Sequence, residues 1–222
     1  MTAISSDSIH HLRTSKLLRQ FEGMLKTMQP LLEEKFGWDE ALQFRQDVVH
    51  LFNEQVLPTI PDIGGRKNIY NPYLQQTGMA LALYRLVKAR GGTLETAGEL
   101  IYRGMMMVIA RYPRFFLHLY GRLSNSKLAY PRIRRGSLIS KKRKYPLDWV
   151  YEFVEGDGQS FNYGIDMLEC GILKYLDQQN ALELAPYLCA VDYITFESMG
   201  IELQRKETLA AGCQRCTFRI IV

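Results

Sequence analysis

The part of this 222-residue sequence that follows residue 118 has no histidine. A thiol in that part therefore has no imidazole nearby in the chain to activate it. No apolar run approaches the roughly 18 residues that a membrane-spanning helix requires. The N-terminal stretch has neither an apolar core segment nor a small-residue cleavage site. We therefore expect a cytoplasmic protein without a membrane partner.

Cysteine is scarce and confined to the last third of the chain. Four cysteines in a chain of this length, without a secretion signal, indicate reduced thiols rather than a disulfide framework. Structural zinc sites usually pair two Cys-x-x-Cys knuckles, and this sequence has one. We therefore predict no metal and no cofactor, and keep a metal site at the single knuckle as the minority alternative. The cysteines are Cys170, Cys189, Cys213 and Cys216.

Acidic residues are absent between Gly121 and Leu147, where nine lysines and arginines occur. Pro131, Gly136 and Pro146 predict a loop here rather than a helix, so residues 127–146 are expected to be a basic connecting loop. A solvated loop that attracts an anionic substrate is the favoured interpretation. Tyrosines between the cations leave a nucleic-acid interface open, but no nucleic-acid motif accompanies them, so nucleic acid is not the expected partner.

Residues 1–126 show helical periodicity and predict an N-terminal helical part. Amphipathic stretches occupy residues 5–28, 38–56, 74–89 and 93–107, and Pro113 can open a further short helix. A loop rich in Pro, Gly and Asn interrupts them at residues 57–73. The backbone amides of Gly64 and Gly65 could approach an anion there, with Asn68 close by, although a stiff connection between helices is the commoner reading.

Residues 147–222 alternate between strand and helix patterns. Residues 149–154 and 160–163 predict a hairpin, residues 164–176 and 184–196 predict two helices, and residues 201–209 and 217–222 predict a second hairpin. We therefore expect an α+β fold, with an N-terminal helical layer followed by a four-stranded antiparallel sheet with two packed helices. The three parts, 1–126, 127–146 and 147–222, are expected to form one compact unit.

Cys189 and Asp192 lie three residues apart in a predicted helix, so the thiol and the carboxylate share one face. Cys189 could attack a carbon as nucleophile, or Asp192 could activate water as general base while Cys189 lines the pocket. A neighbouring carboxylate raises the pKa of a thiol, which makes Asp192 a poor activator of Cys189.

Arg205 falls on the apolar face of its predicted strand, where a guanidinium needs an anionic partner. It could clamp the carboxylate of an amino-acid-like substrate, or form a salt bridge with Asp192 or Glu197. Thr208 could donate a hydrogen bond to the same substrate, or simply be a β-branched strand residue.

The last third of the chain resembles the L-2-amino-thiazoline-4-carboxylic acid hydrolase family. The resemblance lies in Cys170…Cys189-Ala-Val-Asp192…Gly200…Arg205-Lys-Glu-Thr208…Gly212…Cys216-Thr-Phe218-Arg219, and the stretch Leu57–Gly65 with Asn68 resembles the N-terminal half of that family. Cys213 departs from the pattern, because a polar residue is expected after Gly212.

This resemblance implies a hydrolase that opens a small cyclic amidine or amide C–N bond. The family's substrate is L-2-amino-thiazoline-4-carboxylate, which becomes carbamoyl-cysteine in cysteine metabolism. A small-molecule substrate with a carboxylate is therefore the expected partner. The implied catalytic residues are Cys189 and Asp192, and the implied substrate-binding residues are Arg205, Thr208, Gly64, Gly65 and Asn68.

A second resemblance leads to a different class of protein. The ending Gly212-x-x-x-Cys216-x-Phe218 is also similar to the end of 4-vinyl-reductase-like domains, which bind small molecules. The alternative function is therefore a non-catalytic sensor or carrier. Turnover by a titrating acid–base pair would favour the hydrolase, and a closed apolar pocket would favour the sensor.

Overall fold

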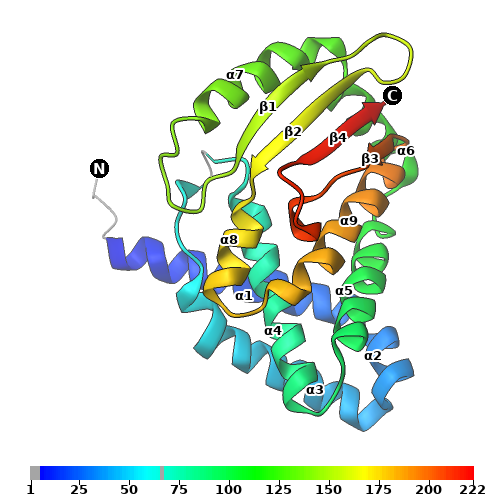
Figure 1. Cartoon of the computed structure of the whole chain (residues 1–222). Coiled ribbons are helices and arrows are strands. Elements are labelled where there is room, and N and C mark those ends of the chain that lie inside the picture. The colour runs from blue at the N-terminus through cyan, green and yellow to red at the C-terminus, as the bar shows by residue number, and fades with distance from the viewer. Residues whose placement is uncertain (1–5, 66–67) are drawn as a thin grey trace, which may run out of the picture. The chain divides into compact units, whose positions relative to one another are not determined.

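The computed structural model describes residues 6–65 and 68–222 (Figure 1). The chain forms two compact units, Met1–Pro61 with Gln75–Val108, and Asp62–Leu74 with Ile109–Val222. Each unit is described by itself below. The predicted division at residues 126 and 147 stays a prediction.

The first unit is helical, as the periodicity of its sequence predicts. Helix α2 begins where Pro30 occupies the first turn, a position that tolerates the missing N–H of proline. The core of the unit is built on Phe21, Phe44 and Phe52, all fully buried, and the rings of Phe21 and Phe52 are 4.8 Å apart. Its helices are α1 (Ser6–Thr27), α2 (Gln29–Phe36), α3 (Trp38–Leu51), most of α4 (Asn71–Ala89) and α5 (Leu94–Ile109).

Two features of this unit follow directly from local sequence. The hydroxyl oxygen of Thr93 accepts a hydrogen bond from the backbone N–H of Thr96 at 3.2 Å, which confirms Thr93 as the N-cap of α5. Between α3 and α4 the chain passes through a π turn (η1, Phe52–Val56) and a 3-10 turn (η2, Leu57–Thr59). None of the helices in the two described ranges is long and apolar enough to cross a membrane.

The second unit contains the predicted four-stranded antiparallel sheet. Its strands are β1 (Val150–Glu155), β2 (Tyr163–Glu169), β3 (Glu202–Arg205) and β4 (Cys216–Ile221), in the order β1-β2-β4-β3 (Figure 1). Both predicted hairpins are present, since β1 pairs with β2 and β3 pairs with β4. The α+β fold class is therefore confirmed.

Strand β2 is longer than its sequence predicts. A helix was expected from Gly164, but residues 163–169 pair with β1 on one side, and residues 163–167 pair with β4 on the other. This two-sided pairing satisfies the backbone groups of a segment whose own side-chain pattern favours a helix. The helix, α8, begins only at Gly171 and ends at Gln178.

The basic stretch is not the loop that its prolines and glycine predict. Residues Tyr130–Ser140 form helix α7, in which Pro131 sits in the first turn and is therefore compatible with the helix. Gly136 lets the helix approach β1, because a Cβ there would lie 2.2 Å from the Tyr151 hydroxyl. Several cations of the stretch pair with strand carboxylates: Arg134 with Glu155, Lys141 with Glu152, and Arg143 with Glu169.

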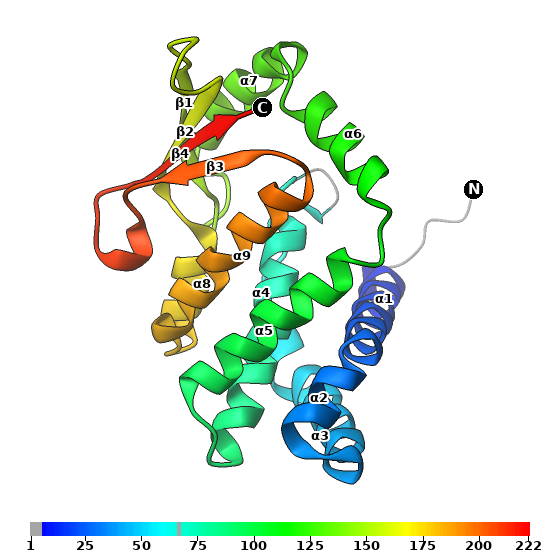
Figure 2. The ribbon, with the colours of Figure 1, turned by 90° about the vertical axis from the view of Figure 1, so that its right-hand side faces the viewer.

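The apolar face of the sheet packs against helices. Helix α7 covers β1, while α9 (Ala185–Ser198) packs on β3 and against α6 (Arg114–Ser124), as both views show (Figures 1 and 2). The buried cluster on this face consists of Tyr130, Tyr163, Ile201, Leu203 and Ile220, with Phe153, Phe196 and Phe218 packed against it. Phe218 and Arg205 are direct neighbours on this face, since they are register partners in β3 and β4.

Candidate active site

Arg205 and Asp192 form a direct ion pair between the end of β3 and helix α9. Nη1 of Arg205 donates to Oδ2 of Asp192 at 2.6 Å, and Nη2 donates to the backbone carbonyl of Cys189 at 2.8 Å. The i,i+3 spacing on α9 places both acceptors on one face of the helix. The structure therefore brings together Cys189, Asp192 and Arg205, the three residues predicted to act at one site.

Two aromatic rings lie close to the guanidinium of Arg205. Its Cζ lies 4.9 Å from the ring centre of Tyr193 and 5.1 Å from that of Phe218. The side chain is only 3% exposed, and its Nε has no hydrogen-bond partner among the described residues. A buried N–H without a partner is uncommon and indicates a position for a water molecule or a ligand atom.

Asp192 differs from Arg205 in its access to solvent. Its side chain is 36% exposed, so the carboxylate can meet a small molecule while the guanidinium behind it stays sealed. Burial raises the pKa of the Asp192 carboxyl, and the charge and hydrogen bond of Arg205 oppose that rise. A carboxylate held in one orientation with a raised pKa is a suitable general base.

The thiols near this ion pair are not activated. Burial raises the pKa of Cys189 to about 12, with Arg205 opposing the shift and Asp192 adding to it. Burial likewise raises the pKa of Cys170 to about 11 and raises that of Cys216. All three are therefore protonated at neutral pH, and a protonated thiol is a weak nucleophile.

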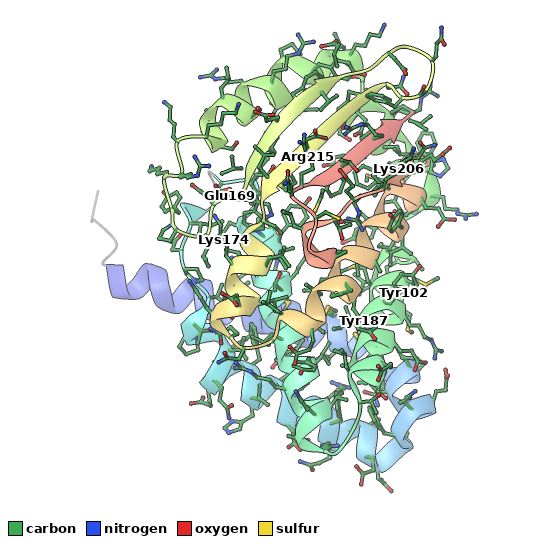
Figure 3. All side chains as sticks on the ribbon, viewed as in Figure 1. Tyr102, Glu169, Lys174, Tyr187, Lys206 and Arg215 are labelled. Atoms are coloured by element: carbon green, nitrogen blue, oxygen red, sulfur yellow. The ribbon has the colours of Figure 1, made fainter. Side chains whose placement is uncertain are left out.

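Cys170 lies between β2 and α8, where an ion-pair network holds the junction. Glu169 accepts from Lys174 of α8 at 2.5 Å and from Arg143 at 2.6 Å. Figure 3 shows Glu169 and Lys174 side by side at this junction. The hydrogen bond from Lys174 is the main cause of the lowered pKa of Glu169. The network sets where β2 ends, and so sets the position of Cys170.

Two tyrosines near these groups were not predicted from the sequence. The ring of Tyr70 stacks on Trp149 at 4.7 Å, and its hydroxyl interacts electrostatically with Cys170. Burial, and then the charge of Asp192, raise the pKa of Tyr73. Tyr70 directly precedes α4 and Tyr73 lies in its first turn, with the two ring centres 6.1 Å apart. No sequence pattern connected them to Cys170 or Asp192, more than 95 residues away.

The predicted substrate loop makes its contacts with the protein itself. The amides of Gly64 and Gly65 donate to Oδ1 of Asp62 at 2.8 and 2.7 Å, so the anion that they bind here is a side chain of their own loop. Asn68 donates to the carbonyl of Ile63 and to Asp148. No described contact joins these residues to Arg205 or Asp192. Their role in substrate binding stays a prediction.

Gly64 and Gly65 offer a matched test of this loop. Gly64 has φ of +100°, and a Cβ there would lie 2.7 Å from the Tyr145 hydroxyl, whereas Gly65 has φ of +54° with nothing within 4 Å. We expect Gly64→Ala to lower the free energy of unfolding by about 2–3 kcal/mol. Gly65→Ala should cost about 1 kcal/mol. Urea unfolding of both variants measures the difference, and equal losses would contradict this account of the loop.

Thr208 and the Cys213/Cys216 pair lie in the β3–β4 connection. Thr208 caps the 3-10 turn η6 (Leu209–Ala211), where its hydroxyl accepts from the amide of Ala211 at 3.2 Å. The sulfur of Cys216 accepts from the amide of Leu209 at 3.2 Å. Cys213 precedes β4 rather than lying in it. Within residues 6–65 and 68–222, no group of three or more His, Cys, Asp or Glu side chains is arranged to hold a metal ion.

The opposite face of the sheet carries a separate charged cluster. Asp166 is buried and accepts from Arg215 at 3.0 Å and from Arg219 at 2.7 Å. Arg215, labelled in Figure 3, lies just before β4. Asp166 pairs with Thr217, so it faces away from Phe218 and the Arg205 site. Its two arginines compensate a buried carboxylate, and none of the predicted substrate-binding residues belongs to the cluster.

Comparison with known proteins agrees with the resemblance in the sequence. The family model for L-2-amino-thiazoline-4-carboxylic acid hydrolase matches residues 73–220. This range includes Cys189, Asp192, Arg205 and Thr208 and excludes the loop of Gly64, Gly65 and Asn68. Neither a curated protein nor a solved structure matches the chain. The chain belongs to the L-2-amino-thiazoline-4-carboxylic acid hydrolase family.

Proposed function

We propose that the protein hydrolyses a small cyclic amidine or amide, with L-2-amino-thiazoline-4-carboxylate as the first substrate to examine. Water would add to the ring carbon that carries the sulfur, the ring nitrogen and the amino group. The bond from this carbon to the ring nitrogen would break, and that nitrogen would take a proton. The product would be carbamoyl-cysteine with the carbamoyl group on the sulfur. The family match supports this reaction at the level of the family.

The observation that carries the proposal is the ion pair of Asp192 with Arg205. A sealed guanidinium orients a carboxylate that is itself one-third exposed, so one partner is fixed and the other is accessible. In this role Asp192 removes a proton from the attacking water, and Arg205 is a positioning residue. The rings of Tyr193 and Phe218, 4.9 and 5.1 Å from Cζ, help to bury the guanidinium and limit its movement.

Cys189 supports this site without acting as the nucleophile. Its thiol is protonated at neutral pH because burial raises its pKa to about 12. Its backbone carbonyl accepts from Arg205, so its position on α9 matters whatever its side chain does. Both predicted catalytic residues therefore belong to the proposal, with water activated by Asp192 as the attacking group.

Arg205 is less available to the substrate than the sequence suggests. Nη1 and Nη2 already donate to Asp192 and to the Cys189 carbonyl. Nε has no partner among the described residues but is itself buried, so a substrate carboxylate does not reach the guanidinium in this structure. Arg205 is therefore proposed to position Asp192, and its role as a clamp on the substrate carboxylate stays a prediction.

The first test is turnover of L-2-amino-thiazoline-4-carboxylate by the wild-type protein and by Cys189→Ala. We expect ring opening by the wild type and a loss of less than about tenfold in kcat for the variant, because no bond forms to the sulfur. Mass spectrometry of quenched reactions should show no covalent adduct on the protein. A loss of more than about 10³-fold, or an adduct at Cys189, would make the thiol the nucleophile instead.

Binding without turnover is the second candidate function, and the state of the thiols is the observation that favours it. Cys170, Cys189 and Cys216 are all protonated, and protein groups already occupy both Nη atoms of Arg205. A sensor or carrier of the 4-vinyl-reductase-like kind requires no activated group. Calorimetric binding of the substrate by a wild-type protein that does not open the ring would establish this function.

A further inference from the structure

Helix α6 has an apolar face turned away from the rest of its own unit. Five large apolar side chains from Phe115 to Leu123 are between 45% and 69% exposed, and they recur at intervals of one, three and four residues. This spacing makes one continuous stripe along the helix. The stripe consists of Phe115, Phe116, Leu119, Tyr120 and Leu123.

The opposite side of α6 is the one that meets the protein. Gly121 is buried, and a Cβ at this position would lie 2.5 Å from the carbonyl oxygen of Met199. The glycine therefore allows close packing of α6 at the end of α9 and fixes which face of the helix is turned inward. The outward direction of the apolar stripe follows from this contact.

The segment that follows α6 exposes further large apolar side chains. Leu128, in the turn η4 (Lys127–Ala129), is 90% exposed, and Leu138 and Ile139 of α7 are also exposed. A row of exposed apolar side chains such as the stripe on α6 is uncommon on a protein surface and marks an interaction site.

The segment that carries these apolar side chains is rich in cations and has no acidic residue of its own. No Asp or Glu occurs between Glu99 and Asp148. Some cations of this segment pair with strand carboxylates, as Arg134, Lys141 and Arg143 do. Others are exposed on α6, η4 and α7 and have no carboxylate within ion-pair distance among the described residues. These are Arg114, Arg122, Lys127, Arg132 and Arg135.

We infer that α6, with the exposed residues of η4 and α7, is a peripheral docking surface for an anionic phospholipid bilayer. An amphipathic helix with aromatic and leucine side chains on one face and arginines beside them lies in the plane of the membrane interface. Basic residues add attraction to anionic headgroups. The expectation of no membrane partner came from the lack of a membrane-spanning stretch, and peripheral binding does not require one.

Two other partners fit the surface less well. Leu119, Leu123 and Leu128 have no aromatic face on which a nucleic-acid base could stack, whereas leucine is well suited to acyl chains. A second copy of this chain, joined by a twofold axis, would place the same cation-rich surface against itself. That arrangement would bring the arginines of α6 against each other, and α6 has no carboxylate of its own to compensate them.

Co-sedimentation of the full chain with vesicles tests the inference. We expect the wild type to bind vesicles of phosphatidylcholine with about 30% phosphatidylserine, and to bind pure phosphatidylcholine at least about tenfold more weakly. Leu119→Ser with Leu123→Ser should weaken binding about tenfold or more, since two apolar side chains leave the interface. Arg122→Glu should weaken it about fivefold or more, and salt should reduce it further.

The chain offers matched controls for both kinds of change. Leu182→Ser removes an exposed leucine of the 3-10 turn η5 (Leu182–Leu184), and Lys206→Glu makes the same charge change at an exposed position after β3, so both should bind as the wild type does. Thermal melting would show that each variant folds. Vesicle binding by the α6 variants that equals that of the wild type overturns the inference, and so does the lack of a preference for anionic vesicles. So does sedimentation without lipid, which indicates a second copy, or RNA binding that is insensitive to the leucine changes.

Discussion

Asp192→Asn should lower kcat/KM for L-2-amino-thiazoline-4-carboxylate by about 10²–10⁴-fold, the usual effect of a general base. Asparagine can still accept a hydrogen bond from Nη1 of Arg205, so the local structure should survive the change. It cannot remove a proton from water. The loss should therefore appear mainly in kcat, measured by following formation of carbamoyl-cysteine.

Glu197→Gln is the matched control for that variant. It also neutralises a carboxylate on α9, but Glu197 is exposed and has no contact with Arg205. We expect its activity to stay within about twofold of the wild type. If both variants lost activity equally, helix α9 as a whole rather than Asp192 would be responsible, and the assignment of the base would be wrong.

The pH profile supplies an independent readout for Asp192. A general base acts when ionised, so kcat/KM of the wild type should rise with pH through the pKa of Asp192. Burial raises that pKa above its ordinary value, which moves the acid limb toward neutral pH. Any residual activity of Asp192→Asn should lack this limb. A limb that persisted unchanged would assign the titration to another group.

The second large effect is expected on stability. Arg205→Met should lower the free energy of unfolding by about 2–3 kcal/mol, because it leaves a partly buried carboxylate without its partner. This expected loss of unfolding free energy is small for a broken ion pair, since Asp192 is 36% exposed and water solvates the carboxylate that loses its partner. Urea unfolding of the variant measures it.

A double-mutant cycle separates the ion pair from the packing of Arg205. Arg205→Met, Asp192→Asn and the double variant should show a coupling of about 1 kcal/mol or more, because the double variant has no uncompensated charge. Arg205→Lys keeps the charge but loses the two-pronged geometry and the stacking on Tyr193 and Phe218, so it should restore only part of the stability. Additive effects would show that the pair does not couple.

We expect Arg205→Met to shift the pH profile of catalysis as well. Arg205 opposes the rise in the pKa of Asp192, so its removal should raise that pKa further. The acid limb of kcat/KM for Arg205→Met should therefore move to higher pH than in the wild type. A limb that stayed in place, together with an unchanged kcat, would limit Arg205 to a purely structural role.

Local pattern predicted the elements on which the candidate site is built. The i,i+3 spacing placed Cys189 and Asp192 on one helix face, and α9 confirms that helix. The alternation of residues 201–205 placed Arg205 on the apolar face of a strand, and β3 confirms it next to Phe218. Such periodicities need no distant contact, so they can be read from the sequence.

Contacts between segments distant in the sequence made two of the predictions wrong. β2 continues past Gly164 because β1 and β4 hydrogen-bond to it on both sides. The basic stretch becomes helix α7 because Pro131 falls in a first turn and Gly136 lets the helix pack on β1. In both places the neighbour that decides the conformation lies elsewhere in the sequence, so local propensity alone favours the wrong state.

The sequence by itself determined the fold class, the family, and the face on which each candidate residue lies. The tertiary structure decided which anion each donor meets. The amides of Gly64 and Gly65 meet Asp62, and the guanidinium of Arg205 meets Asp192. It also decided the protonation of Cys189, whose pKa rises through burial. Pairing and burial depend on segments brought together only in the folded chain, so no pattern within one segment specifies them.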